Sequence, residues 1–163
     1  MIKFKNLTMK NFLSVGNVTQ AIDLDGQDLI LVMGENKDLG GNDSGSRNGV
    51  GKTLVSNAIS YALFGQALNS IRKDNLINRT NEKNMLVTLD FEVSGKKYKI
   101  ERGRKPSVMK FFVEGVQQEE SKDESQGDSR ETQNHITKIL NMSHDMFKHI
   151  VCLNTYTDAF LNM

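Results

Sequence analysis

Residues 2–12 alternate between apolar and polar side chains, as a half-buried β-strand does. Within this stretch, IKFKNLTMKNF, the positions that we expect to face a protein interior are Ile2, Phe4, Leu7 and Met9. A second short strand is predicted in TQAID, residues 19–23, because the Asp25–Gly26 pair that follows favours a turn. The chain therefore begins as β-structure with one apolar face.

A run of consecutive apolar residues, Leu29–Met33, comes next. Bounded by Asp28 and a glycine, it predicts a strand that is buried on both faces. Residues 35–50 are rich in Gly, Asn, Asp and Ser, which is typical of a loop. From Thr53 the spacing becomes helical, and we expect that helix to end at Gly65. Its apolar stripe consists of Leu54, Val55, Ala58, Ile59, Ala62 and Leu63.

The second half of the chain predicts an antiparallel meander. Alternating segments between residues 85 and 113 are joined by a Ser94–Gly95 turn and by a connection that contains Pro106. Their inward positions are Met85, Val87, Leu89, Phe91, Val93, Tyr98, Ile100, Met109, Phe111 and Val113. Together with the first half, this predicts an α/β fold of the α+β kind, with antiparallel strands beside a strand–loop–helix unit.

Two short helices are predicted near the end. The first is indicated by the spacing of Ile136, Ile139 and Leu140, and Ser143 is placed to cap the second. The apolar stripe of the second helix consists of Met146, Phe147, Ile150 and Val151.

Composition limits the classes of function. The chain has 163 residues, enough for one domain, with 21 basic and 20 acidic side chains and a formal net charge of +1. No overall field favours nucleic acid or a membrane surface, so such binding would need a local patch. The single cysteine, Cys152, excludes an internal disulfide and is expected to be a core residue. Neither a signal peptide nor a membrane-spanning run is present, which predicts a cytosolic protein without a membrane partner.

The most informative stretch is SRNGVGKT, residues 46–53. It ends in the Gly-Lys-Thr of a phosphate-binding loop and lacks only the opening glycine, where Ser46 stands. In such a loop backbone amides surround the phosphates, Lys52 reaches the β and γ phosphates, and the Thr53 hydroxyl binds Mg²⁺. The strand–loop–helix order is the context this chemistry needs. The predicted nucleotide-binding residues are Asn48, Gly49, Val50, Gly51, Lys52, Thr53 and Leu54.

The missing glycine has an explanation in the preceding residues. Gly34 ends the apolar run, so GEN (34–36) can begin the loop, with about twelve polar residues inserted before its phosphate-facing part. Gly34 and Asn36 are therefore added to the predicted site. The insertion also contains Asp38, Asn42 and Asp43, but their spacing does not fit the oxygen-ligand template of a calcium loop.

Two charged segments stand out in the second half. Residues 96–105 carry six basic side chains and Glu101, a net charge of +5. The functional interpretation is a contact with a DNA backbone, predicted for Lys96, Lys97, Arg102, Arg104 and Lys105, and the alternative is a solvated face. Residues 119–131 are strongly acidic and lack apolar side chains, which predicts a mobile loop.

Several stretches in this order resemble one family: MKNFLSVG, the phosphate loop, SYALFGQ, NLIN and KKYKIERGRKP. Over essentially the whole chain they are similar to the N-terminal half of SbcC-type ATPase heads, relatives of the chromosome-maintenance ATPases. The likeness is strongest to the large subunits of tailed-phage recombination endonucleases.

The resemblance implies the first lobe of an ABC-type head that binds ATP and Mg²⁺. In this family the two lobes are separated by a coiled coil, two heads close on two nucleotides, and a nuclease subunit of SbcD type cuts DNA ends. It also implies action in the cytoplasm of a phage-infected host.

The match has one departure and one absence. FKHIVCLNTYTDAFL is similar to the segment that carries a metal-contacting glutamine in the family, yet Asn154 and Thr155 stand there. Either could offer Mg²⁺ an oxygen more weakly. The family's signature motif, Walker B strand, switch histidine and coiled coil do not occur in this chain, so the resemblance implies nucleotide binding without hydrolysis.

Two other hypotheses stay open from the residues. One is a small P-loop enzyme of another class, such as a small-molecule kinase; the meander argues against it, because such kinases return to a parallel strand. The other is a non-catalytic DNA-binding or scaffolding module whose loop is vestigial. Nucleotide titration against a Lys52→Ala variant separates that module from an ATPase lobe.

Overall fold

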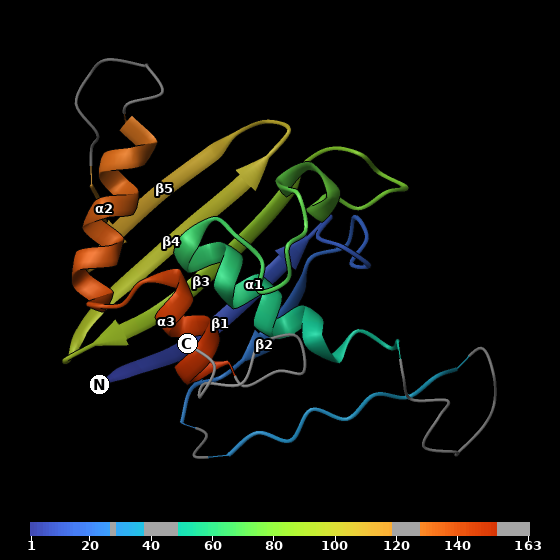
Figure 1. The fold of residues 1–163 in the computed structure, drawn as a ribbon, viewed down its shortest axis with the longest axis horizontal. Coiled ribbons are helices and arrows are strands. Elements are labelled where there is room, and N and C mark those ends of the chain that lie inside the picture. The colour runs from blue at the N-terminus through green and yellow to red at the C-terminus, as the bar shows by residue number, and fades with distance from the viewer. Residues whose placement is uncertain (27–28, 38–48, 119–127, 153–163) are drawn as a thin grey trace.

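The computed structural model describes residues 1–26, 29–37, 49–118 and 128–152. Its main feature is an antiparallel sheet with helices against one face (Figure 1). The strand order is β2-β1-β3-β4-β5-β6. The strands are β1 (Ile2–Lys10), β2 (Gln20–Asp23), β3 (Met85–Val93), β4 (Lys96–Arg104), β5 (Val108–Val113) and β6 (Val116–Gln117).

A β-bulge in β1 changes which of its residues face the protein interior. Phe4 pairs with Phe91, but Asn6 pairs with Asp90, so Lys5 is an extra residue in the ladder. The inward positions therefore move from even to odd numbers, and Leu7 and Met9 are buried as predicted.

Tight turns connect the meander. Ser94 and Gly95 both have positive φ, 51° and 84°, which matches the right-handed twist of the hairpin between β3 and β4. Glu114 and Gly115 repeat this arrangement between β5 and β6, a short strand that the sequence pattern does not predict. The predicted meander is confirmed over its full length.

The helical part consists of α1 (Lys52–Phe64), the 3-10 turn η2 (Lys73–Leu76), α2 (Asp128–Leu140), α3 (His144–Met146) and the π-helical turn η3 (Phe147–Val151). Helix α1 ends at Gly65, whose φ of 69° closes the helix through a bond from its amide to Tyr61 O. Ser143 caps α3 by accepting a hydrogen bond from the Met146 amide at 3.1 Å. Both boundaries agree with the sequence prediction.

The core lies between α1, α2 and the inner face of the sheet. Its buried side chains include Phe12, Leu63, Leu89, Ile100 and Ile136. Two polar residues of α1 are buried as well: Asn57 accepts a hydrogen bond from the Leu68 amide, and Ser60 Oγ donates to the Gln66 carbonyl. His144 Nε2 lies 3.1 Å from the same Ser60 oxygen, which ties α3 to α1.

The predicted buried strand at Leu29–Met33 is wrong in this structure. These residues form no strand, and Leu29, Leu31 and Met33 are 89%, 79% and 76% exposed. A continuous apolar run indicates a strand that other elements cover on both faces. Here none of the described residues buries either face of this segment. The segment is apolar and extended but unburied.

Two further expectations need correction. The acidic stretch 119–131 is predicted to be a loop throughout, but α2 already begins at Asp128; residues 119–127 lie outside the described part. The apolar stripe of the last helix is buried only at Phe147, while Met146, Ile150 and Val151 remain exposed. Among the described residues, no helix has the length and apolarity needed to cross a membrane.

Candidate functional site

The candidate site is the start of α1. Gly49 and Gly51 adopt φ values of 80° and 91°, which a residue with a side chain rarely does, so the chain can curl into the helix. Gly51 is the N-cap, and the Leu54 amide donates to its carbonyl at 2.9 Å. Because the cap is a glycine, no cap side chain competes with an anion at this end of the helix. Lys52 and Thr53 have exposed side chains at this end.

Gly34 closes the loop from the other side. A Cβ on Gly34 would lie 1.9 Å from Val50 Cγ2 and 3.5 Å from Lys52 Cγ, so only glycine allows this approach. The two ends of the predicted insertion therefore meet at the start of α1. This agrees with the prediction that Gly34 begins the phosphate loop. Asn36 is half-buried in the same limb, whereas Asn48 and Ser46 lie outside the described residues.

An open hollow of about 700 Å³ adjoins the loop. Ser14 belongs to its wall, and a Cβ on Gly51 would lie 3.7 Å from Ser14 Oγ, so the wall lies beside the start of α1. Most of its lining residues are of polar types, and two of them carry guanidinium groups. It consists of Leu13, Ser14, Ser70, Ile71, Arg72, Asn75, Asn78, Arg79 and Thr80.

None of these hollow-lining residues is assigned to the site by the sequence alone. The signal available is the polar, basic segment 69–84 directly after α1. Only the fold shows that this segment returns to the start of the helix, since the wall at Ser14 comes from the far end of β1.

The loop suits a nucleotide phosphate and its cation. Three glycines give a cradle that a Cβ would fill or strain, and Lys52 and Thr53 bring a cation and a hydroxyl to its mouth. Within the described residues, no group of three or more His, Cys, Asp or Glu is arranged for a metal ion. Of the three residues predicted to hold Mg²⁺, Thr53 lies in the described part of the chain, and Asn154 and Thr155 lie outside it.

The far end of α1 is held by the guanidinium of a half-buried arginine. Arg102 of β4 donates from Nε to the Ala62 carbonyl at 3.1 Å and from Nη2 to Gln133 Oε1 at 2.6 Å. Gln133 of α2 donates in turn to the Leu63 carbonyl at 3.0 Å. A cation at a helix C-terminus is favoured by the helix dipole. Burial lowers the pKa of Arg102 to about 10, with Tyr61 opposing the shift, so the guanidinium stays charged at neutral pH.

This placement corrects the predicted DNA patch. The five residues do not form one surface, because side chains alternate between the faces of β4. Arg102 and Arg104 share the helix-covered face with Tyr98 and Ile100, and Arg104 Nε lies 2.6 Å from Asp74 Oδ1. That contact raises the pKa of Arg104 and lowers that of Asp74. Lys96, Lys97 and Lys105 are exposed.

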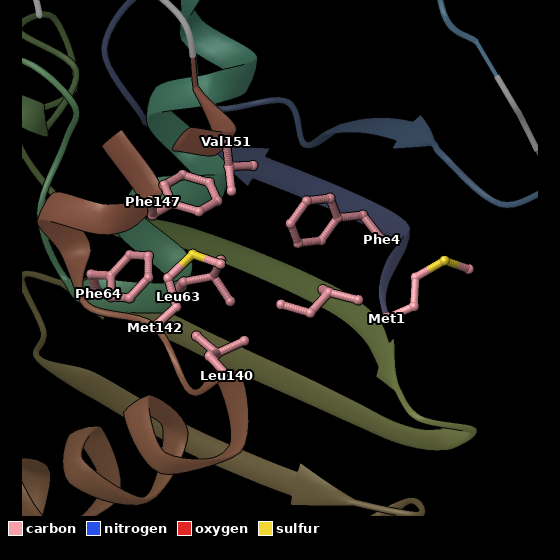
Figure 2. A pocket seen from close by; sticks show the side chains of 9 residues that line it. Met1, Phe4, Leu63, Phe64, Leu140, Met142, Phe147 and Val151 are labelled. Carbon is pink, nitrogen blue, oxygen red and sulfur yellow. The ribbon is translucent and has the colours of Figure 1, made fainter. Parts of the chain in front are cut away.

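A second hollow, of about 390 Å³, is apolar and unsuited to phosphate. Figure 2 shows side chains from β1, the end of α1 and the segment after α2 gathered around it. Its lining consists of Met1, Ile2, Phe4, Leu63, Phe64, Leu140, Met142, Phe147 and Val151, so no charged side chain faces a ligand there. The polar hollow beside Gly51 is the stronger candidate.

Comparison with known proteins identifies the family of this chain. Residues 6–162 match the protein family described as AAA domain. The chain is 35% identical over 153 residues to exonuclease subunit 2 of Escherichia phage RB69, and 36% identical to that of Enterobacteria phage T4. Both alignments cover 94% of this chain but only 24% of the relative.

A solved structure shares the fold. The Smc head domain of Pyrococcus furiosus, crystallised with an extended coiled coil and bound to the C-terminal domain of ScpA, matches with a TM-score of 0.52. The match covers 89% of this chain and 35% of that chain, at 18% identity, and therefore speaks for the fold alone. The predicted fold, an ATPase head lobe of ABC type, is confirmed.

Proposed function

Because this chain belongs to the AAA domain family, we propose that it is the ATP- and Mg²⁺-binding lobe of a DNA repair or recombination ATPase. The observation that carries the proposal is the contact of Gly34 with Val50 at the start of α1, which supports a phosphate loop that begins at Gly34. The phage relatives, both called exonuclease subunit 2, support a role beside a nuclease subunit on DNA ends, inside an infected bacterial cell.

In this proposal each group has a defined task. The amides of residues 49–53 donate to phosphate oxygens, and Lys52 adds a charge-assisted hydrogen bond. Thr53 Oγ1 would hold Mg²⁺, which supplies charge neutralisation at the phosphates when bound. The hollow beside Gly51 gives room for the remainder of the nucleotide, with Arg72 and Arg79 on its rim.

The lobe needs further chain to become an ATPase. The exposed apolar segment Leu29–Met33 and the half-exposed Val55 and Ile59 of α1 leave apolar surface without cover in the described residues. We assign this surface to a C-terminal lobe, since this chain spans 24% of its phage relatives. A second copy of the head would then close on the nucleotide, and a nuclease subunit of SbcD type would dock on the assembly.

The DNA contact is proposed in a reduced form. Lys96, Lys97 and Lys105 are exposed and remain candidates for phosphate contacts, whereas Arg102 is removed from the set and Arg104 is paired. Replacing the three lysines with alanine in the assembled complex should lower the slope of log affinity against log salt by up to about three counterions. An unchanged slope returns them to a solvated face.

Nucleotide titration tests the central proposal. We expect ATP with Mg²⁺ to raise the thermal unfolding midpoint of the chain, and Lys52→Ala to abolish the rise. Lys110→Ala is the matched control, because it removes the same charge from an exposed position on β5. Ser46→Ala should retain most of the effect. Equal behaviour of the Lys52 and Lys110 variants would favour the alternative of a vestigial loop.

A further inference from the structure

The wall beside the start of α1 contains a backbone under strain. Asn11 and Leu13 have φ values of 50° and 51°, in the left-handed region. Asparagine tolerates this region, but leucine rarely adopts it, because its Cβ comes too close to the following carbonyl oxygen. A leucine persists there only when its surroundings hold it.

Leu13 is held by two residues, Leu76 at the end of η2 and Asn78 just after it. The Leu13 amide donates to the Leu76 carbonyl at 2.7 Å, and Asn78 Nδ2 donates to the Leu13 carbonyl at 3.0 Å. Both backbone polar groups of Leu13 are therefore bonded to residues 76–78. The backbone amide of Asn78 also donates a hydrogen bond to the Asn11 carbonyl at 2.9 Å.

Asn78 itself is fixed in orientation. It is 9% exposed, and its Oδ1 accepts hydrogen bonds from the amides of Thr80 and Asn81, each at 3.1 Å. With the oxygen committed to these amides, the NH₂ group is the part that faces Leu13. The side-chain amide of Asn78 thus has one orientation that satisfies its hydrogen bonds to Leu13, Thr80 and Asn81.

We propose that Asn78 is a positioning residue for the phosphate loop. By holding Leu13 in the left-handed conformation, it presents the next residue, Ser14, to the loop at Gly51. The same bond joins Leu13 to the segment that carries Arg72 and Arg79, so displacement of that segment moves Ser14. This inference rests on the proposed function, because it assigns Asn78 to the nucleotide site.

The matched variant is Asn78→Asp. It keeps the size of the side chain and the acceptor for Thr80 and Asn81, but it replaces the donor to Leu13 with a carboxylate oxygen facing a carbonyl. We expect about tenfold weaker ATP binding, as for one lost hydrogen bond with an unsatisfied partner. Ser14→Ala added to Asn78→Asp should weaken binding little further, because both act on the same contact.

Ile136→Val is the control for general destabilisation, since Ile136 is buried in α2 away from the loop. It should lower the unfolding midpoint and leave ATP affinity unchanged. If Asn78→Asp binds ATP as the wild type does, or if its effect multiplies independently with that of Ser14→Ala, the inference is overturned.

A second measurement does not depend on nucleotide. In ¹⁵N–¹H spectra of the nucleotide-free chain, Asn78→Asp should shift the amide signals of Ser14 and Gly51, and Ile136→Val should not. Wild-type protein that binds no ATP would refute the proposed function, while shifted Gly51 signals would still support the positioning role. Unshifted signals would refute the positioning role itself.

Discussion

At the scale of single residues, the contact between Gly34 and Val50 is the most demanding in the site. Gly34→Ala would drive a methyl group into Val50 Cγ2, a β-branched side chain with little freedom to turn aside. We expect a loss of about 1–3 kcal/mol in unfolding free energy, typical of overpacking, together with weaker ATP binding. Chemical denaturation and nucleotide titration measure the two effects.

The pair offers its own control. Val50→Ala removes the clashing methyl group, so the Gly34→Ala/Val50→Ala double variant should recover much of the loss. Gly16→Ala should be neutral or slightly stabilising, because nothing lies within 4 Å of a Cβ there. If the double variant recovers neither unfolding free energy nor ATP binding, the contact between residues 34 and 50 is not the cause of the loss.

Arg102 gives a second prediction at this scale. Arg102→Ala leaves Gln133 Oε1 and the Ala62 carbonyl without a donor, and we expect it to lower the unfolding free energy by about 1–3 kcal/mol. Arg104→Ala breaks a surface ion pair with Asp74 and should change stability little. Equilibrium unfolding of both variants checks the contrast, and equal losses would place Arg102 among ordinary surface cations.

At the scale of elements, we expect the docking of α3 on α1 to depend on pH. Burial lowers the pKa of His144 from its usual 6.5, with Asp145 opposing the shift and Lys148 adding to it. The unfolded chain therefore takes up the proton first as pH falls, so stability is complete above pH 6.5 and is lost as pH falls through the folded pKa.

Urea denaturation at pH 7.5 and pH 5.5 tests this dependence. The wild type should lose stability between the two conditions, and His144→Gln should lose less. His149→Gln, in the turn after α3, serves as the histidine control and should keep the wild-type loss. An unaltered loss in the His144 variant would assign the pH dependence to other groups.

Most elements could be predicted because their periodicity reports one local environment. The strands of the meander, the end of α1 at Gly65 and the cap at Ser143 each depend on neighbouring residues alone. The inward orientation of Arg102 could also be predicted from the sequence, because in a strand every second side chain lies on the same face, and Arg102 follows Tyr98 and Ile100 in that alternation. The predicted DNA patch misses it because it treats every charged side chain of the strand as exposed and does not apply that count.

The misses share a physical cause. Leu29–Met33 is predicted to be buried from its apolarity, but burial needs a covering surface that these residues do not contain. The hollow beside Gly51 escapes prediction because its walls lie far apart in sequence, at Ser14 and at residues 70–80. Long-range contacts of this kind leave no periodic pattern. The loop residues Lys52 and Thr53 could be named because phosphate binding needs a short contiguous motif.

At the scale of the whole molecule, the likeness to SbcC-type ATPase heads read from the sequence is confirmed by the phage relatives and the Smc head fold. That the chain by itself does not hydrolyse ATP is a prediction. Phosphoryl transfer needs a positioned water and charge stabilisation at the γ-phosphoryl group, and the resemblance assigns both to the C-terminal lobe and the opposing head. Steady-state ATP hydrolysis by this chain should stay at background.

Adding the C-terminal lobe of the same protein should restore turnover, and Lys52→Ala should abolish the restored activity. Leu31→Lys should leave the chain folded but prevent the restoration, since Leu31 is 79% exposed here and is assigned to the interface. Multiple turnover by this chain alone, dependent on Lys52, would instead indicate a complete P-loop enzyme.

The position of β1 has a consequence for how the chain is made. Although β1 precedes the other strands in the sequence, it lies in the interior of the sheet, between β2 and β3. It can pair early with β2, Leu7 opposite Ile22 and Met9 opposite Gln20, but its other partner β3 begins only at Met85, with Ile2 opposite Val93. Closing so long a loop is slow, whereas β3, β4 and β5 pair with their immediate neighbours. On a ribosome, we therefore expect the meander to form by itself, the β1–β2 pair to join it last, and a chaperone to compete for that pair.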